Sequence, residues 1–229
     1  MHALFGLVAA ALTLFTAPAL AVGLADLSNK DTIAGMKEAL TTGSQAAVDV
    51  LARQDGFLGN ERVRIPLPES LHKVEGLMRG LGMGKYADEL VTTMNRAAES
   101  AVAEAKPLLV NAVKNMSVQD AKGILTGGED AATQYFKRST ADALSNKFLP
   151  IVKKATQKVQ LADKYNAFAG KGAKLGLIDQ KDADLNNYVT QKALNGLFLM
   201  IAEEEKKIRR DPLGSASGII RKVFGAIGK

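Results

Sequence analysis

The segment Ala193-Leu-Asn-Gly-Leu-Phe-Leu-Met-Ile-Ala202 decides the fold of this 229-residue chain. As an α-helix it is apolar nearly all round, and a helix of that kind is buried in the middle of a protein. It is far shorter than the roughly 20 residues that a membrane-spanning helix needs. We therefore predict a central, buried helix that starts near Asp184 and stops at Asp211-Pro212.

Outside this segment, apolar residues recur at intervals of three and four, which is the period of a helix. The further helices expected from this period cover about 28–56, 68–81, 85–116, 117–126 and 129–168. We predict an all-α, single-domain, irregular helical bundle of about six to eight helices around the buried C-terminal helix.

Prolines and capping residues refine these expected boundaries. Pro107 should kink or interrupt the helix that contains it, and Pro150 should bend or break another, because proline removes a helix hydrogen bond. The stretch 65–68, Ile-Pro-Leu-Pro, should be extended, because residues before proline avoid the α region. Capping-box patterns at 28–31 and 117–120 mark two helix starts.

The first 21 residues have the pattern of a signal peptide. An apolar stretch, Leu4 to Phe15, precedes Ala19-Leu20-Ala21, which places small residues where signal peptidase accepts them. We predict cleavage after Ala21, a mature domain of residues 22–229 and a periplasmic location. The alternative is a membrane anchor, but the apolar stretch is shorter than the roughly 20 residues that a bilayer requires.

Composition excludes several chemistries. The chain has no Cys, so disulfides, thiolate nucleophiles and Cys-ligated metals are excluded. It has only two His, His2 and His72, and cleavage of the signal peptide would leave one, which excludes multi-His metal sites as well. We therefore expect no cofactor and no metal. The net charge of +6 permits nucleic-acid binding. The signal peptide and the lack of an aromatic stripe interleaved with basic residues argue against it, so we expect no nucleic-acid partner.

The densest polar segment of the chain is 129–140. In one interpretation it is an anion or polar-ligand site, in which Arg138 and Lys137 supply charge and Gln134 and Tyr135 supply hydrogen bonds. In the other it is an ordinary helix start, in which Asp130 suits the positive end of the helix dipole and Tyr135 enters the core. Composition alone favours the helix start.

Two other polar groups interrupt apolar helices. Asn95, Arg96 and Glu99 lie in an Ala-rich helix, where Asn95 and Glu99 are one turn apart and face together. Glu203 and Glu204 end the apolar run of the last helix. Glu204 lies one turn from apolar residues on either side, so we expect it to be partly buried. A buried carboxylate needs a partner, which would be Arg96 or Arg138.

The last segment, 213–229, reads as a short basic amphipathic helix. Its residues 218–229 combine apolar side chains with three cations: Ile219, Ile220, Val223, Phe224 and Ile227 with Arg221, Lys222 and Lys229. It could make peripheral contact with anionic lipid. The alternative, a final helix docked on the bundle, is favoured because the segment has little polar face.

Four segments resemble the bacterial domain-of-unknown-function family 4197. They are residues 65–68, 94–99, 130–136 and the stretch from 188 to 209, which occur in order along nearly all of the mature chain. The usual pattern has Asp where this chain has Asn195. The resemblance implies an exported, helical bacterial protein without an established activity. It also strengthens the functional interpretation of the polar segments, since they carry the likeness.

These patterns lead to three functional hypotheses. In the first, the chain is a non-enzymatic envelope protein that binds a lipid or other amphiphile, an anionic ligand or an envelope protein. Its ligand would lie in a cleft lined by nine residues: Asn95, Arg96, Glu99, Asp130, Gln134, Tyr135, Arg138, Glu203 and Glu204. In the second, Glu99 or Glu204 is the general base of a hydrolase, and an arginine holds an anion. In the third, the bundle is purely structural.

Overall fold

A computed structural model describes residues 29–82, 84–158 and 184–211, together with the single residues 163, 174 and 218. It contains the helices α1 (Asn29–Ala52), α2 (Glu69–Gly80), α3 (Gly84–Val102), η2 (Ala103–Ala105), α4 (Lys106–Lys114), α5 (Val118–Thr126), α6 (Ala131–Thr156) and α8 (Leu185–Arg210). The described residues form an all-α bundle, as predicted. The signal peptide, the cap at Ser28 and the tail except Gly218 lie outside the described residues.

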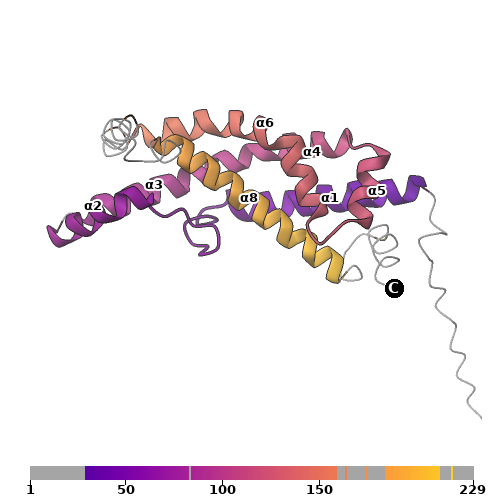
Figure 1. The fold of residues 1–229 in the computed structure, drawn as a ribbon, viewed down its shortest axis with the longest axis horizontal. Helices are drawn as coiled ribbons and strands as arrows, with labels where there is room; N and C mark the ends of the chain where they lie inside the picture. The colour runs from indigo at the N-terminus through magenta and orange to yellow at the C-terminus, as the bar shows by residue number, and fades with distance from the viewer. Residues whose placement is uncertain are drawn as a thin grey trace, which may run out of the picture.

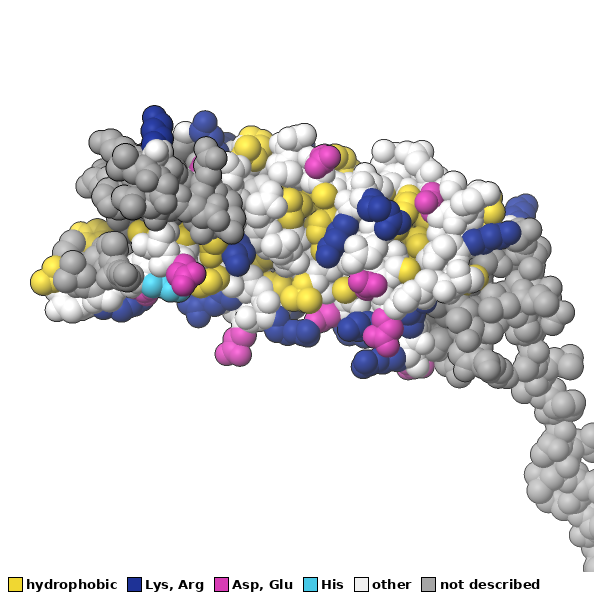
Figure 2. Space-filling view, viewed as in Figure 1, with side chains coloured by type: hydrophobic (Ala, Val, Ile, Leu, Met, Phe, Trp, Pro, Cys, Tyr) yellow, Lys and Arg dark blue, Asp and Glu magenta, His cyan; other side chains and the backbone are white. Residues whose placement is uncertain are grey.

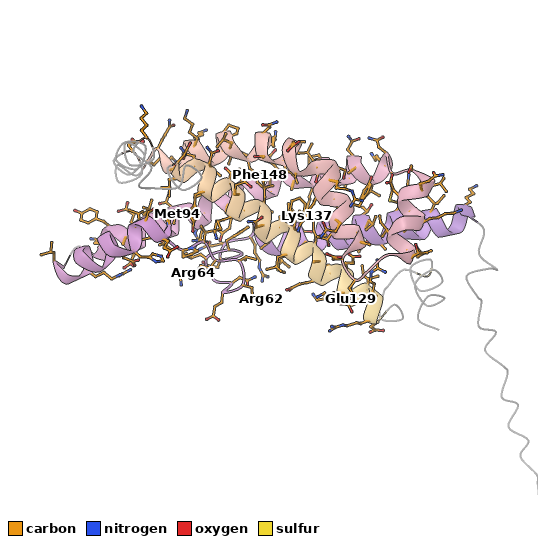
Figure 3. The ribbon with its side chains drawn as sticks, viewed as in Figure 1. Arg62, Arg64, Met94, Glu129, Lys137 and Phe148 are labelled. Carbon is orange, nitrogen blue, oxygen red and sulfur yellow. The ribbon has the colours of Figure 1, made fainter. Side chains whose placement is uncertain are left out.

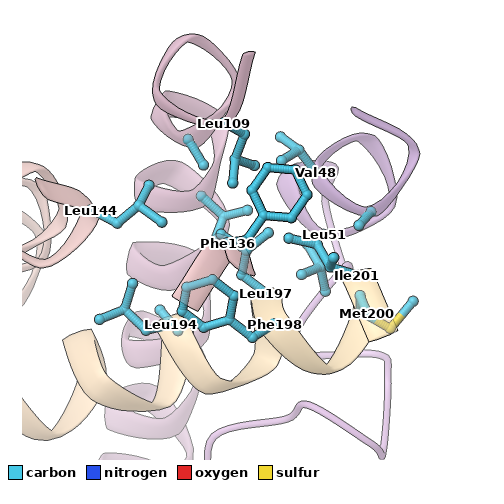
Figure 4. Packing of buried hydrophobic residues seen from close by; sticks show 14 of the residues in the cluster. Val48, Leu51, Leu109, Phe136, Leu144, Leu194, Leu197, Phe198, Met200 and Ile201 are labelled. Carbon is cyan, nitrogen blue, oxygen red and sulfur yellow. The ribbon is translucent and has the colours of Figure 1, made fainter. Parts of the chain in front are cut away.

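The C-terminal helix α8 packs against α1, α3 and α6 (Figure 1). Its side chains Leu194, Leu197 and Ile201 belong to the core of the protein. Figure 4 shows this core gathered around Phe136 of α6, with residues of α1 and α4 on its other side. The opposite face of α8 is open to solvent at Asn195 and Leu199, so the helix is covered on one side rather than all round.

Gly196 explains how closely the chain packs on α8. A Cβ atom at this position would lie 2.7 Å from the ring of Phe57, which is fully buried. Phe57 belongs to the loop 53–68 between α1 and α2, which runs beside α8 (Figure 1). A glycine therefore allows this loop to contact the helix directly.

The two prolines behave differently. Pro107 lies in the first turn of α4, directly after the 3-10 segment η2, so the predicted interruption is confirmed. Pro150 lies inside α6, which continues through it to Thr156, so the expected break is absent. Pro150 deprives the carbonyl of Asn146 of its helix partner. Both residues are exposed, so water can hydrogen bond to that carbonyl.

The loop before α2 has the non-helical backbone that its prolines predict. Residues 65–68 are in neither helix nor strand, and α2 begins directly after them. α2 pairs with α3 at one end of the elongated molecule, and α5 lies towards the other (Figure 1). Among the described residues, no helix is both long and apolar enough to cross a membrane.

The predicted capping box at the start of α5 is present. Ser117 Oγ accepts a bond from Asp120 N at 3.1 Å, and Asp120 accepts bonds from the hydroxyl and the backbone N–H of Ser117 at 2.6 and 3.0 Å. The hydroxyl bond, followed by the backbone bond, holds the pKa of the Asp120 carboxyl below its ordinary value. A lowered pKa in the folded state stabilises the fold above the unfolded-state pKa.

We expect Asp120→Asn to lower the free energy of unfolding by about 0.5 kcal/mol at neutral pH, a small loss because solvent screens this carboxylate. The difference between wild type and variant should vanish as the pH falls through the folded-state pKa, since Asp120 is then neutral as well. Urea unfolding of both proteins at neutral and acidic pH measures this difference in the free energy of unfolding. A difference that grew on acidification would contradict this assignment.

Candidate functional site

Asn95 on α3 holds the loop 53–68 by hydrogen bonds to both the backbone N–H and the backbone C=O of Ile65. Its Oδ1 accepts a bond from Ile65 N at 2.8 Å, and its Nδ2 donates to Ile65 O at 2.9 Å and to Val91 O at 2.8 Å. Asn95 and Ile65 are fully buried. This side chain therefore replaces the backbone partners that an extended, buried segment would otherwise lack.

Glu99, one turn further along α3, holds the other end of the same loop. Its Oε1 accepts bonds from the backbone N–H groups of Phe57 and Leu58 at 3.1 and 3.2 Å. Its Oε2 accepts a bond from Arg96 at 2.8 Å. Asn95 and Glu99 do face together, as predicted, and what they face is the chain's own loop.

Arg96 completes this group, which we call the loop clamp (Asn95, Arg96 and Glu99). Its second terminal nitrogen donates to Asp55 at 2.8 Å. The bond to Glu99, and then the bond to Asp55, raise the pKa of the Arg96 guanidinium. Asp55 has a positive φ of 63°, a left-handed conformation that aspartate tolerates better than most residues, and its side chain is tied to Arg96 in this conformation.

The most deeply buried carboxylate of α8 is Glu205, which is not among the nine residues predicted for the site. It accepts bonds from Ala132 N at 3.0 Å and from Thr133 N and Oγ1 at 3.0 and 2.9 Å. Arg209 donates to it from Nε and from a terminal nitrogen at 3.1 and 2.9 Å. Glu205 therefore caps the N-terminus of α6, although it belongs to another helix. We call Glu205 and Arg209 together the α6 cap.

Arg209 extends the α6 cap to a third helix. It also donates to the carbonyl oxygen of Ile124 in α5 at 2.8 Å. The side chains of Arg209 and Glu205 are 16% and 6% exposed, so this ion pair is largely shielded from water. Removing either partner would leave the other charge buried and unpaired.

Glu203 and Glu204 each form an ion pair, and that of Glu204 differs from the one expected. Glu203 pairs with Arg62 of the loop, and Glu204 pairs with Lys207 one turn further along α8. Glu204 is partly buried, with 17% of its side chain exposed, as predicted. The expected pairing of Glu204 with Arg96 or Arg138 is wrong, because α8 directs Glu204 towards α1, where its Cβ lies near Gly43.

Tyr135 and Arg138 of α6 line a hollow of about 480 Å³ between α4, α5 and the first turns of α6. The Tyr135 hydroxyl donates to Ala112 O at 2.7 Å, and burial raises the pKa of this phenol. Asn111, Asn115 and Ser139 also line the hollow. We call it the Arg138 hollow.

Arg138 differs from the other predicted site residues. It is exposed, and within the described part of the chain it makes no hydrogen bond and no ion pair. Its charge acts at longer range on Asp120, where it helps to lower the carboxyl pKa. The guanidinium therefore keeps its donors available on the wall of the hollow.

The nine predicted residues thus divide among separate places. Asn95, Arg96 and Glu99 form the loop clamp, and Asp130 and Gln134 bond to each other at 2.9 Å on the surface. Tyr135 and Arg138 line their hollow, Glu203 lines another hollow beside Arg62, and Glu204 pairs with Lys207. Figure 3 shows Arg62 on the loop and Lys137, the neighbour of Arg138, on the other side of α8.

Glu205 could have been found from the sequence. Leu194, Phe198, Ile201 and Glu205 follow one another at intervals of four, three and four, so Glu205 continues a buried stripe. Glu204, the residue predicted to be partly buried, lies on the neighbouring stripe with Met200 and Ile208. Within the described ranges, no group of three or more acidic or His side chains could hold a metal ion.

Residues 26–225 match the family model described as a protein of unknown function, DUF4197. The chain belongs to this family. No curated protein and no solved structure matches it. The DUF4197 membership covers nearly the whole chain and confirms the resemblance seen in the sequence.

The segments that carry the DUF4197 resemblance bond to one another in pairs. Ile65, in the first segment, is held by Asn95 in the second. Thr133, in the third segment, is held by Glu205 in the fourth. Asn95, Thr133 and Glu205 therefore stabilise the fold, and Arg138 lies just outside these segments.

Proposed function

We propose that this DUF4197 protein is an exported, non-enzymatic binding module that takes a small anionic ligand in the Arg138 hollow. The observation that carries the proposal is the guanidinium of Arg138, which lines a hollow of about 480 Å³ with no hydrogen bond or ion pair to any described residue. A guanidinium in that state can bind a carboxylate or phosphate in bidentate fashion.

The rest of the hollow suits a ligand with one anionic group. Among the charged residues that line it, Arg138 is balanced by Asp120, so the lining is neutral overall. Its other polar groups are amides and hydroxyls, supplied by Asn111, Asn115 and Ser139. A ligand would place one anionic group on Arg138 and uncharged polar groups on these side chains.

The hydrolase alternative has less support. A general base needs an oxygen that is free to take a proton from substrate or water. Both oxygens of Glu99 accept bonds from backbone N–H groups or Arg96, and both oxygens of Glu205 are occupied in the α6 cap. Glu204 is paired with Lys207. Glu99 and Glu205 therefore hold the loop 53–68 and the start of α6 in place, which favours binding over catalysis.

Export to the periplasm is part of the proposal and rests on the sequence. An apolar stretch followed by Ala19-Leu20-Ala21 fits a cleaved signal, and the absence of Cys suits a protein whose core replaces disulfides. N-terminal sequencing of the protein purified from a bacterial periplasm should begin at Val22. Recovery with an intact Met1 would contradict export by cleavage.

Native mass spectrometry of the protein purified from a bacterial host tests the ligand site. We expect a small anionic molecule bound one to one, and we expect Arg138→Ala to weaken its binding by at least about tenfold, because a hydrogen bond to a charged group is worth about 1.5–3 kcal/mol. Lys137→Ala is the matched control, since Lys137 is an exposed neighbouring cation that does not line the hollow. Equal binding by wild type and Arg138→Ala would refute the site.

A further inference from the structure

A second surface lies on the solvent-facing side of α8. Arg62 of the loop and Leu199, Glu203, Lys206, Lys207 and Arg210 of α8 line a shallow hollow of about 360 Å³. We call this the α8 surface. Figure 2 shows Lys and Arg side chains, interspersed with Asp and Glu, along the lower edge of the molecule, where the loop and the end of α8 lie.

The charges of the α8 surface are arranged in layers. The side chains of Arg62, Lys206 and Lys207 are 62%, 47% and 68% exposed, whereas those of Glu203 and Glu204 are each 17% exposed. Glu203 therefore lies beneath the cations, which point to solvent on long aliphatic stems, and Glu204 lies beside them on the side that faces α1. Glu129, 3.9 Å from Lys206, is an exposed acid at the edge of this surface.

Two other hollows lack this excess of positive charge. The Arg138 hollow has one cation and one carboxylate in its lining. A third hollow, of about 440 Å³ beside α2, is lined by Arg64 and Arg79 together with Glu61, Glu75 and Asp88. The α8 surface has four cations and one carboxylate in its lining, so it is the most positive of these three.

An exposed apolar side chain lies among these cations. Leu199 is 39% exposed and lies seven residues before Lys206 and eleven before Arg210. Those intervals place all three on one face of α8. On this face the cations could contact lipid phosphates while Leu199 reaches the acyl boundary, although the main apolar face of α8 is buried in the core.

We infer that the α8 surface is a docking surface for a bilayer that contains anionic phospholipid. Its cations are spread along the helix face instead of converging on one point as Arg138 does in its hollow, which fits an extended anionic surface better than a single small ion. Peripheral membrane contact through residues 218–229 is a separate hypothesis that rests on the sequence alone. Apart from Gly218 they lie outside the described residues, so the test leaves them unchanged.

The test is co-sedimentation of the full mature chain with vesicles of phosphatidylcholine, with and without phosphatidylglycerol. Wild type should bind the phosphatidylglycerol vesicles, and added salt should weaken the binding. The double variant Lys206→Gln/Arg210→Gln should bind at least about tenfold more weakly, and Leu199→Asn should bind severalfold more weakly. Lys153→Gln/Lys154→Gln removes the same charge from exposed positions of α6 and should bind like wild type.

Three results would overturn the inference. The first is equal binding to both vesicle types, and the second is an equal loss in the two double variants, which would indicate a general charge effect. In the third, inorganic phosphate displaces the protein from vesicles better than chloride of the same ionic strength, which would identify a site for discrete phosphate. Circular dichroism of each variant confirms that it is folded, and all of these substitutions are at exposed positions.

Discussion

Replacing Glu205 by alanine is expected to lower the free energy of unfolding by about 3–5 kcal/mol, the largest effect of any single substitution considered for this chain. The change removes five hydrogen bonds in which Glu205 is the acceptor. Two backbone N–H groups at the start of α6 lose their partner. Arg209 keeps its charge in a position where only 16% of its side chain is exposed.

Urea unfolding of Glu205→Ala and wild type measures this loss. Glu204→Ala is the control, because Glu204 is the adjacent acid of α8 and its ion pair is with an exposed lysine. A pair of that kind contributes about 0–1 kcal/mol. If Glu205→Ala and Glu204→Ala lost similar amounts, the α6 cap would not have the role assigned to it.

The second large effect concerns the loop clamp. We expect Asn95→Leu to lower the free energy of unfolding by about 2–4 kcal/mol. Leucine fills a similar volume, but the N–H and C=O groups of Ile65 then lose both bonds to Asn95 while Ile65 stays buried. The loop 53–68 should loosen before the bundle unfolds, because the loop loses its anchor while the packing between the helices is unchanged.

Hydrogen exchange followed by mass spectrometry distinguishes loosening of the loop from unfolding of the whole bundle. Peptides from 53–68 should exchange much faster in Asn95→Leu than in wild type, whereas peptides of α6 should change little. Glu89→Ala, an exposed substitution on the same helix, is the control and should leave both regions unchanged. Uniformly faster exchange throughout the variant would show that Asn95 supports the whole core and not this loop.

The sequence predicted the fold because periodicity and proline act locally. The apolar stripes of α3 and α8, the cap at Ser117 and the interruption before Pro107 each depend on neighbours within a few residues. A bend or a break was expected at Pro150, and α6 continues through it without a break, because the cost of a proline depends on whether the freed carbonyl of Asn146 meets solvent or a neighbour. That depends on how α6 packs, which the local sequence does not contain.

The candidate site was harder to predict, for a different reason. Asn95 and Glu99 were correctly placed on one helix face, but their partners lie 30 to 42 residues away in the loop. Glu205 reaches a helix start 72 and 73 residues away. A local pattern shows that a polar residue is buried. It does not show whether the group opposite is a ligand or the protein's own backbone.

The central claim is that Arg138, unlike the clamp and cap residues, is free to bind a ligand. The free energy of unfolding of ligand-free Arg138→Ala, measured beside ligand-free wild type, tests this claim most directly. We predict a difference within about 0.5 kcal/mol, because Arg138 has no hydrogen bond or ion pair to a described residue. A loss of about 2 kcal/mol or more would show that Arg138 supports the bundle, and would contradict the proposed site.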